Sequence, residues 1–167
     1  MLVLLRFVAL LLLVVLGAFG LWLVFVNLAK RENSIWFGGR PSTLGVTDGK
    51  LGGPRKTPNS VVSEGIDSTH PAYVAPIAFA GDPRAALAKL GSVLQALDRV
   101  IIIRVEETYL YAEFRSKTFG YIDDFEARVD SAASVIHLRS ASRLGHSDRG
   151  FNRARVEMIR KKFAATE

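Results

Sequence analysis

An uncharged apolar run from Phe7 to Leu28 constrains this chain more than any other feature. As a helix, the run reaches about 33 Å, which is enough to cross the hydrocarbon core of a bilayer. The alternative, a cleaved signal peptide, would have a shorter apolar stretch ending at a small-x-small site, whereas this run continues through Trp22 and Phe25. We therefore predict a single membrane-spanning anchor over residues 1–31.

Basic residues flank the apolar run unequally. Arg6 precedes it, whereas Lys30, Arg31 and Arg40 follow it. By the positive-inside rule, this charge bias mildly favours a cytoplasmic position for the rest of the chain.

Composition divides the rest of the chain into a tether and a domain. Glycine and proline punctuate residues 32–56, where aliphatic residues are few, and this pattern predicts a flexible linker. Residues 57–167 are numerous enough to bury a hydrophobic core without a metal or disulfides. Because the chain contains no cysteine, disulfides, thiolate catalysis and cysteine-ligated metals are excluded.

Hydrophobic periodicity predicts that the domain is α+β. Asp82 and Pro83 are typical of a helix start, and leucines follow them at helical spacing. A second helix is expected from Ser147 or Asp148 to about Phe163. We predict an antiparallel sheet of four to five strands with both helices packed on one face, preceded by the transmembrane helix. The expected strands are Val100–Glu106, Thr108–Arg115, Gly120–Asp130 and Val135–Arg143, with Tyr73–Ala80 as a further edge strand.

Alternating apolar residues set the register of the last two strands. Phe125, Ala127 and Val129 are expected to face the core, with Ile136 and Leu138 facing it from the next strand. Matching these faces gives the pairs Val129–Ile136, Arg128–His137, Glu126–Arg139 and Asp123–Ser142, with Asp124, Glu126 and Arg128 pointing outward. In the two preceding strands, the residues expected to share the core face are Ile101, Ile103, Leu110, Ala112 and Phe114.

Asp123 falls on the inward face in this register, opposite Ser142 and near Ser140. An uncompensated buried carboxylate is costly, so we expect hydrogen bonds from these serines and from backbone N–H groups at the start of the last helix. We favour this structural role for Asp123 over a catalytic one.

Basic residues crowd the segment from Arg139 to Lys162, within a chain of net charge +6. Arginine dominates the first half of this segment, and guanidinium groups bind carboxylates and phosphates at two points. A helix N-terminus adds backbone donors for an anion. We therefore predict a binding or accessory module for an anionic lipid, glycan or envelope protein, with an ordinary solvated helix face as the alternative. The predicted binding residues are Arg139, Arg143, Arg153, Asp148 and Asn152.

An enzymatic function is the second hypothesis. A hydrolase-like enzyme would use Asp123, Asp124 or Glu126 with His137 or His146 as acid and base, provided that they meet in one cleft. The sequence contains no Gly-x-Ser-x-Gly, phosphate-loop or His-Glu-x-x-His motif, and we expect neither a cofactor nor a metal. Nucleic-acid binding ranks third, because a membrane anchor disfavours it.

Three segments resemble the domain-of-unknown-function family 1499: PNSVVS at Pro58–Ser63, YIDDFEARVD at Tyr121–Asp130 and HLRSASRLGHSDRGFNRAR at His137–Arg155. Members of that family often carry cysteines around the PN motif, where this chain has Thr57 and Ser60, so no redox or metal role transfers to it. Members typically follow a signal or membrane anchor and face away from the cytoplasm. Against the charge bias, the resemblance therefore implies an extracytoplasmic domain on a bacterial inner membrane.

Overall fold

The computed structural model describes residues 2–29 and 38–166, and the chain divides into two compact units, residues 1–39 and 40–167. The first unit contains helix α1 (Leu2–Ala29), whose mean hydropathy over Arg6–Phe25 is 2.8. This helix is long and apolar enough to cross a membrane, a property that it shares with signal sequences. Residues 30 and 31 of the predicted anchor and residues 32–37 of the predicted linker lie outside the described residues.

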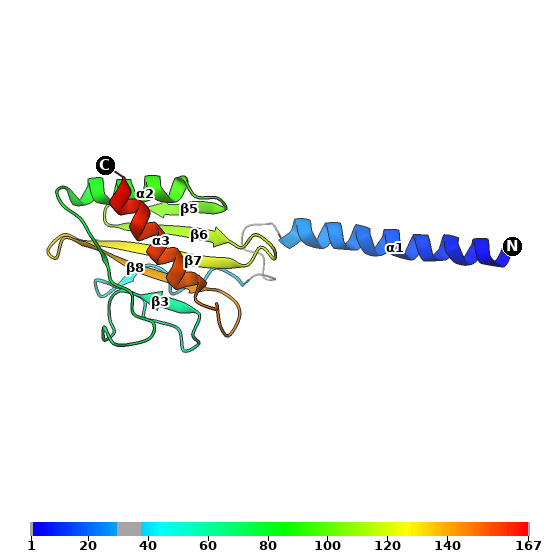
Figure 1. Cartoon of the computed structure of the whole chain (residues 1–167), viewed down its shortest axis with the longest axis horizontal. Coiled ribbons are helices and arrows are strands. Elements are labelled where there is room, and N and C mark those ends of the chain that lie inside the picture. Colours follow the sequence, from blue (N-terminus) through cyan, green and yellow to red (C-terminus); the bar gives the residue numbers. More distant parts are fainter. Residues whose placement is uncertain (1, 30–37, 167) are drawn as a thin grey trace. The chain divides into compact units, whose positions relative to one another are not determined.

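The second unit is built around a six-stranded antiparallel sheet (Figure 1). Its strands follow the order β3-β8-β7-β6-β5, and β4 also pairs with β8. The predicted α+β class is confirmed, but the sheet has six strands instead of four to five, because β3 and β4 pair with different parts of β8. The bounds are β3 (Ser60–Val62), β4 (Ile77–Ala78), β5 (Val100–Val105), β6 (Tyr109–Arg115), β7 (Ile122–Asp130) and β8 (Val135–Ser142).

The register predicted for β7 and β8 is confirmed at every expected pair: Val129–Ile136, Arg128–His137, Glu126–Arg139 and Asp123–Ser142. The face predicted for β5 is wrong. Val100 and Ile102 pack against the main core, whereas Ile101 is exposed and Ile103 packs on the opposite side of the sheet. The residues Val100–Ile103 are all apolar, so their pattern does not distinguish one face from the other.

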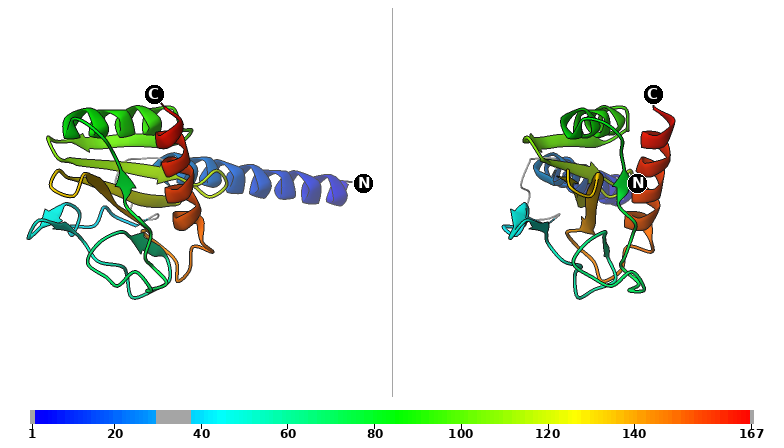
Figure 2. Two further views of the ribbon diagram at one scale, coloured as in Figure 1. Left: turned by 60° about the vertical axis from the view of Figure 1, so that its left-hand side comes forward. Right: turned by 90° about the vertical axis from the view of Figure 1, so that its left-hand side faces the viewer.

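Helices α2 (Pro83–Gln95) and α3 (Phe151–Ala165) cover one face of the sheet, as predicted (Figure 2). The Asp82 carboxylate accepts a hydrogen bond from the Ala85 N–H and so caps α2. The predicted apolar stripes are buried in the core between the helices and the sheet. They consist of Leu87, Leu90 and Leu94 on α2 and Val156, Ile159 and Phe163 on α3.

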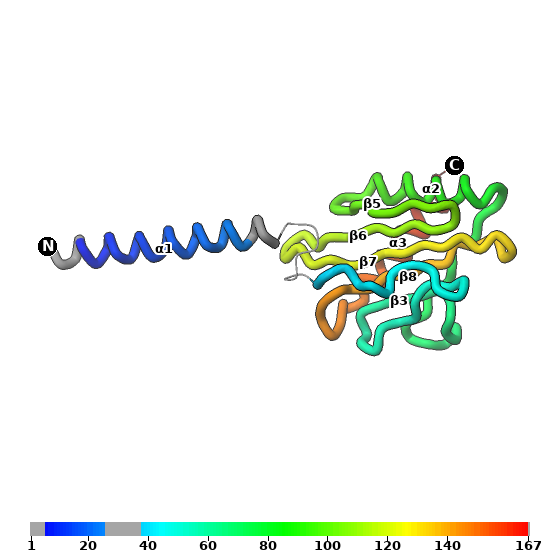
Figure 3. The backbone as a smooth tube through the Cα atoms, turned by 180° about the vertical axis from the view of Figure 1, so that it is seen from behind, coloured from blue at the N-terminus to red at the C-terminus, as the bar shows by residue number. Residues whose placement is uncertain are grey.

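The other face of the sheet is covered by residues 40–56, here called the cover segment. Figure 3 shows this segment crossing β7 and β8 on the side opposite the helices. It contains a short hairpin of β1 (Val46–Thr47) and β2 (Lys50–Leu51), joined by Asp48 and Gly49. Both linking residues have positive φ, as a two-residue type I′ turn requires. Residues 40–56 therefore belong to the compact unit and do not form the flexible linker that their glycine content suggested.

Candidate functional site

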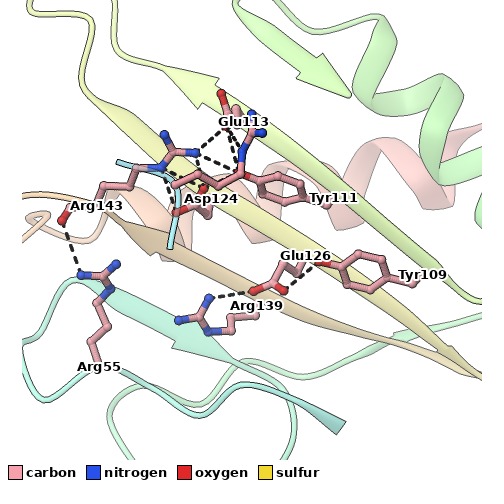
Figure 4. A network of polar contacts seen from close by, with 9 residues as sticks. Arg55, Tyr109, Tyr111, Glu113, Asp124, Glu126, Arg139 and Arg143 are labelled. Atoms are coloured by element: carbon pink, nitrogen blue, oxygen red, sulfur yellow. Dashed lines mark hydrogen bonds and ion pairs between the residues drawn. The ribbon is translucent and has the colours of Figure 1, made fainter. Parts of the chain in front are cut away.

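A cluster of acidic and basic side chains lies on the sheet face beneath the cover segment (Figure 4). Asp124 and Glu126 point away from the helices, as the alternation predicted, yet both are fully buried. Arg139 and Arg143, predicted to be outward and free to bind a ligand, are also buried, with 6% and 7% of their surface exposed. The prediction failed because the alternation identifies which face a side chain is on but not whether another segment covers that face.

Arg143 lies at the centre of one half of this cluster. Its Nε donates to both carboxylate oxygens of Asp124, at 3.0 and 3.1 Å, and its Nη2 contacts the Glu113 carboxylate at 2.5 Å. The Tyr111 hydroxyl donates to Asp124 at 2.6 Å, and its oxygen also lies 3.0 Å from the Glu113 carboxylate. Arg40 of the cover segment donates from Nη2 to Glu113 at 2.7 Å, so two arginines and a tyrosine satisfy two buried acids.

Glu126 organises the other half of the cluster. Arg139 donates to its Oε2 at 2.7 Å, and the Tyr109 hydroxyl donates to its Oε1 at 2.9 Å. The backbone N–H of Gly45, in the cover segment, donates to the same Oε1 at 2.7 Å. This carboxylate therefore connects two strands of the sheet to the segment that covers them.

The electrostatics of the cluster favour its ionised acids. Burial alone would raise the pKa of Glu113, but hydrogen bonds from Arg40 and Arg143 outweigh burial and hold that pKa below its usual value. Burial alone would lower the pKa of Arg143. Its hydrogen bonds to Asp124 and Glu113, together with the charge of Asp124, raise it by more, so the net pKa of Arg143 is above its usual value. Burial first, and then the neighbouring carboxylates, raise the pKa values of Tyr109 and Tyr111, which keeps both hydroxyls protonated as donors.

Asp123 faces the helices, as its register predicted, but its partner differs from the expected serines. Arg155 of α3 donates from Nη2 to the Asp123 carboxylate at 2.5 Å, with its guanidinium 4.5 Å from the centre of the Phe114 ring. Ser140 and Ser142 instead bond to the side chain of Asn152.

Asn152 and Asp148, both predicted as binding residues, are bonded within the domain around the start of α3. Asn152 is fully buried, and its Nδ2 also donates to the backbone oxygen of Asn59. The Asp148 carboxylate accepts hydrogen bonds from the backbone N–H groups of Gly150 and Asn152, at 3.0 and 2.8 Å. Of the five predicted binding residues, Asp148 and Arg153 are partly exposed, and Arg153 is bonded through its Nη2 to the backbone oxygen of Pro71.

His137 does not meet the acids proposed as its partners. Its Nδ1 lies 3.2 Å from the Ser63 hydroxyl, and its Nε2 lies 3.9 Å from both Glu64 and Asp130. Ser63 and Glu64 directly follow β3, and nothing in the local sequence pattern marked them as neighbours of His137. Glu64 is in turn held by Arg128 at 2.7 Å and by the backbone N–H of Leu51 at 3.0 Å.

These contacts are those of a structural framework. Each of the acids proposed for catalysis, Asp123, Asp124 and Glu126, is paired with an arginine. The Ser63 hydroxyl is buried and accepts the Leu138 N–H, so it is not presented to a substrate. A hollow of about 550 Å³ between β4, α2 and α3 is lined by none of these residues. Within residues 2–29 and 38–166, no group of three histidines or acids is placed to hold a metal.

Several exposed basic and apolar side chains gather at one end of the sheet. The turn between β6 and β7, residues 116–121, and the connection from β8 to α3, residues 143–150, adjoin there, because Arg143 donates its backbone N–H to the oxygen of Ile122. These two connections, together with residues 151–153 at the start of α3, are here called the loop end. Its exposed basic and apolar residues include Lys117, Phe119, Tyr121, Leu144, Arg149 and Phe151.

The second unit of the chain matches a known protein family. The family model described as Protein of unknown function (DUF1499) matches residues 50–163, which is most of the second unit. The chain belongs to this family. No curated protein matches it. The DUF1499 match begins inside the cover segment, so it takes in β2 and the sheet along with both helices on its other face.

Arg143→Met should destabilise the DUF1499 domain by about 3–5 kcal/mol, because the change leaves Asp124 and Glu113 buried without their shared cation. We would measure thermal unfolding of the full-length chain in a mild non-ionic detergent by near-ultraviolet circular dichroism. Arg104→Met, at an exposed position of β5, is the matched control and should leave the transition in place. A loss below about 1 kcal/mol for Arg143→Met would contradict the structural role of the pair.

The DUF1499 domain should lose stability in acid. The pKa of Glu113 and that of Glu64 lie below the usual value of 4.5, because arginine hydrogen bonds outweigh the effect of burial. In acid the unfolded chain therefore binds more protons than the folded one, so stability is full above about pH 4.5 and falls as the pH drops through the folded pKa values. Glu113→Gln should make this fall shallower in pH-dependent unfolding, and Glu106→Gln, at an exposed turn, should not.

Proposed function

We propose that the chain is a membrane-anchored, non-enzymatic module that binds an anionic partner through the loop end. The apolar helix α1 supports the anchor, since its length and hydropathy suit a bilayer span. The pairing of the buried acids with arginines supports a non-enzymatic function, since a general base must be free to take a proton.

The observation that carries this proposal is the separation of the arginines into two groups. Arg139, Arg143 and Arg155 are bonded to carboxylates inside the domain, which leaves them no role with an external anion. At the loop end, by contrast, Lys117 and Arg149 are exposed and Arg153 is partly exposed. Asp148 is the one acid within the loop end, and Lys117, Arg149 and Arg153 outnumber it, so the loop end presents an excess of positive charge to solvent.

The proposal also locates the domain on the extracytoplasmic side of a bacterial inner membrane. The family resemblance supports this side against the charge bias around the apolar run. A C-terminal fusion to alkaline phosphatase, which is active only outside the cytoplasm, should show activity in whole cells, whereas a β-galactosidase fusion should not. The reverse pattern would place the domain in the cytoplasm and contradict the proposed location.

Binding should depend on the basic residues of the loop end. We would hold the full-length chain in phosphatidylcholine nanodiscs and measure its binding to phosphatidylglycerol vesicles on a sensor surface. The triple variant Lys117→Gln, Arg149→Gln, Arg153→Gln should weaken binding roughly 100-fold, since each basic residue near an anionic surface contributes about 1 kcal/mol.

A second triple variant, Lys50→Gln, Lys161→Gln, Lys162→Gln, removes the same charge from exposed positions outside the loop end. This control should bind almost as the unmodified chain does. Equal losses in the two variants would show attraction to net charge alone, and unchanged binding in the first would contradict the proposal.

A further inference from the structure

We infer that the loop end docks on the interface of the same bilayer that holds α1, with aromatic side chains entering the headgroup region. This inference rests on the proposed function and names its anionic partner. It is carried by three observations: exposed apolar side chains at the loop end, basic residues beside them, and a short covalent connection to the anchor.

The apolar side chains of the loop end are large and exposed. Phe119 and Tyr121, on the β6–β7 turn, expose 66% and 49% of their surface, and their ring centres lie 5.6 Å apart. Leu144 follows Arg143, whose backbone is bonded to the residue after Tyr121, and Phe151 begins α3 with 68% exposed. Soluble domains rarely gather such residues at one end without a binding partner.

The basic residues distinguish a bilayer from an ordinary apolar protein surface. Lys117 shares the β6–β7 turn with the aromatic pair, and Arg149 lies two residues before Phe151. Aromatic rings at headgroup depth, together with lysine and arginine facing anionic lipid, form the combination that holds peripheral segments at a membrane interface. The charge and the apolar groups of the loop end therefore match an anionic bilayer surface.

The covalent connection brings this end of the domain near the membrane. Arg40, the first residue of the second unit, is bonded to Glu113, two residues before the end of β6 at Arg115. The ten residues from 30 to 39 separate Arg40 from the end of α1 and span at most about 40 Å. The far end of the sheet is about 30 Å further away along β7. When α1 spans a bilayer, the loop end therefore reaches the surface with this connection far from full extension, whereas the far end of the sheet reaches it only when most of that length is used.

The chain contains no cysteine, so a single introduced cysteine can be labelled without altering other residues. We would place an NBD fluorophore on Thr118→Cys, beside the aromatic pair, in the full-length chain reconstituted into vesicles of phosphatidylglycerol and phosphatidylcholine. The matched control label is on Ala133→Cys, an exposed position in the turn between β7 and β8 at the opposite end of the sheet.

The fluorophore at residue 118 should shift to the blue and be quenched by lipids spin-labelled near the headgroup, whereas the fluorophore at residue 133 should report water. Adding Phe119→Ser and Tyr121→Ser should abolish most of the quenching at 118. The inference is overturned if 118 and 133 report the same aqueous environment. A blue shift at 118 without lipid quenching also overturns it, because that result indicates a protein partner or a second copy of the chain.

Failure of this inference is distinguishable from failure of the proposed function. If the label at 118 stays in water while the loop-end triple variant still weakens vesicle binding in nanodiscs, the proposed function stands and its partner lies elsewhere than the anchoring bilayer. If neither result is obtained, both proposals are wrong.

Discussion

Burial of four carboxylates on one face of the sheet is the constraint on which the domain depends. Glu64, Glu113, Asp124 and Glu126 expose between 0% and 8% of their surface, and an unpaired carboxylate at such sites is costly. Each has an arginine partner: Arg128 for Glu64, Arg139 for Glu126, and Arg143 for both Glu113 and Asp124. Three of them also bond to the cover segment, so this segment and the charged pairs require one another.

The two faces of the sheet differ in how far the sequence predicts them. The helix side follows simple rules, because alternation on β7 and β8 and leucine spacing on α2 identify apolar residues that must be buried. The register of β7 and β8 followed from the same alternation, down to the Glu126–Arg139 pair. The core-facing side of β5 was predicted wrongly, because the apolar residues of β5 do not alternate with polar ones.

The burial of the sheet face beneath the cover segment was not predicted, because most of the side chains buried there are polar or charged. Charged side chains at alternate positions of β7 and β8 are typical of a solvated surface, although their opposite signs also suit paired, covered positions. Two signals were nevertheless present in the sequence. Tyr109 and Tyr111 alternate with apolar residues on β6 and mark a second buried side, and the Asp48–Gly49 dipeptide marks a tight hairpin within the supposed linker. A glycine-rich composition alone does not distinguish an ordered covering segment from a tether.

The contacts of the cover segment also determine how the domain responds to mechanical load. From its first residue onward, the segment is bonded in turn through Arg40 to Glu113, through Gly45 to Glu126 and through Leu51 to Glu64. Tension applied from the N-terminal side therefore reaches these contacts in series, one after another, while the pairing of β3 with β8 is loaded last. We therefore expect pulling to expose the charged groups on the covered face to water before it opens the core beneath the helices.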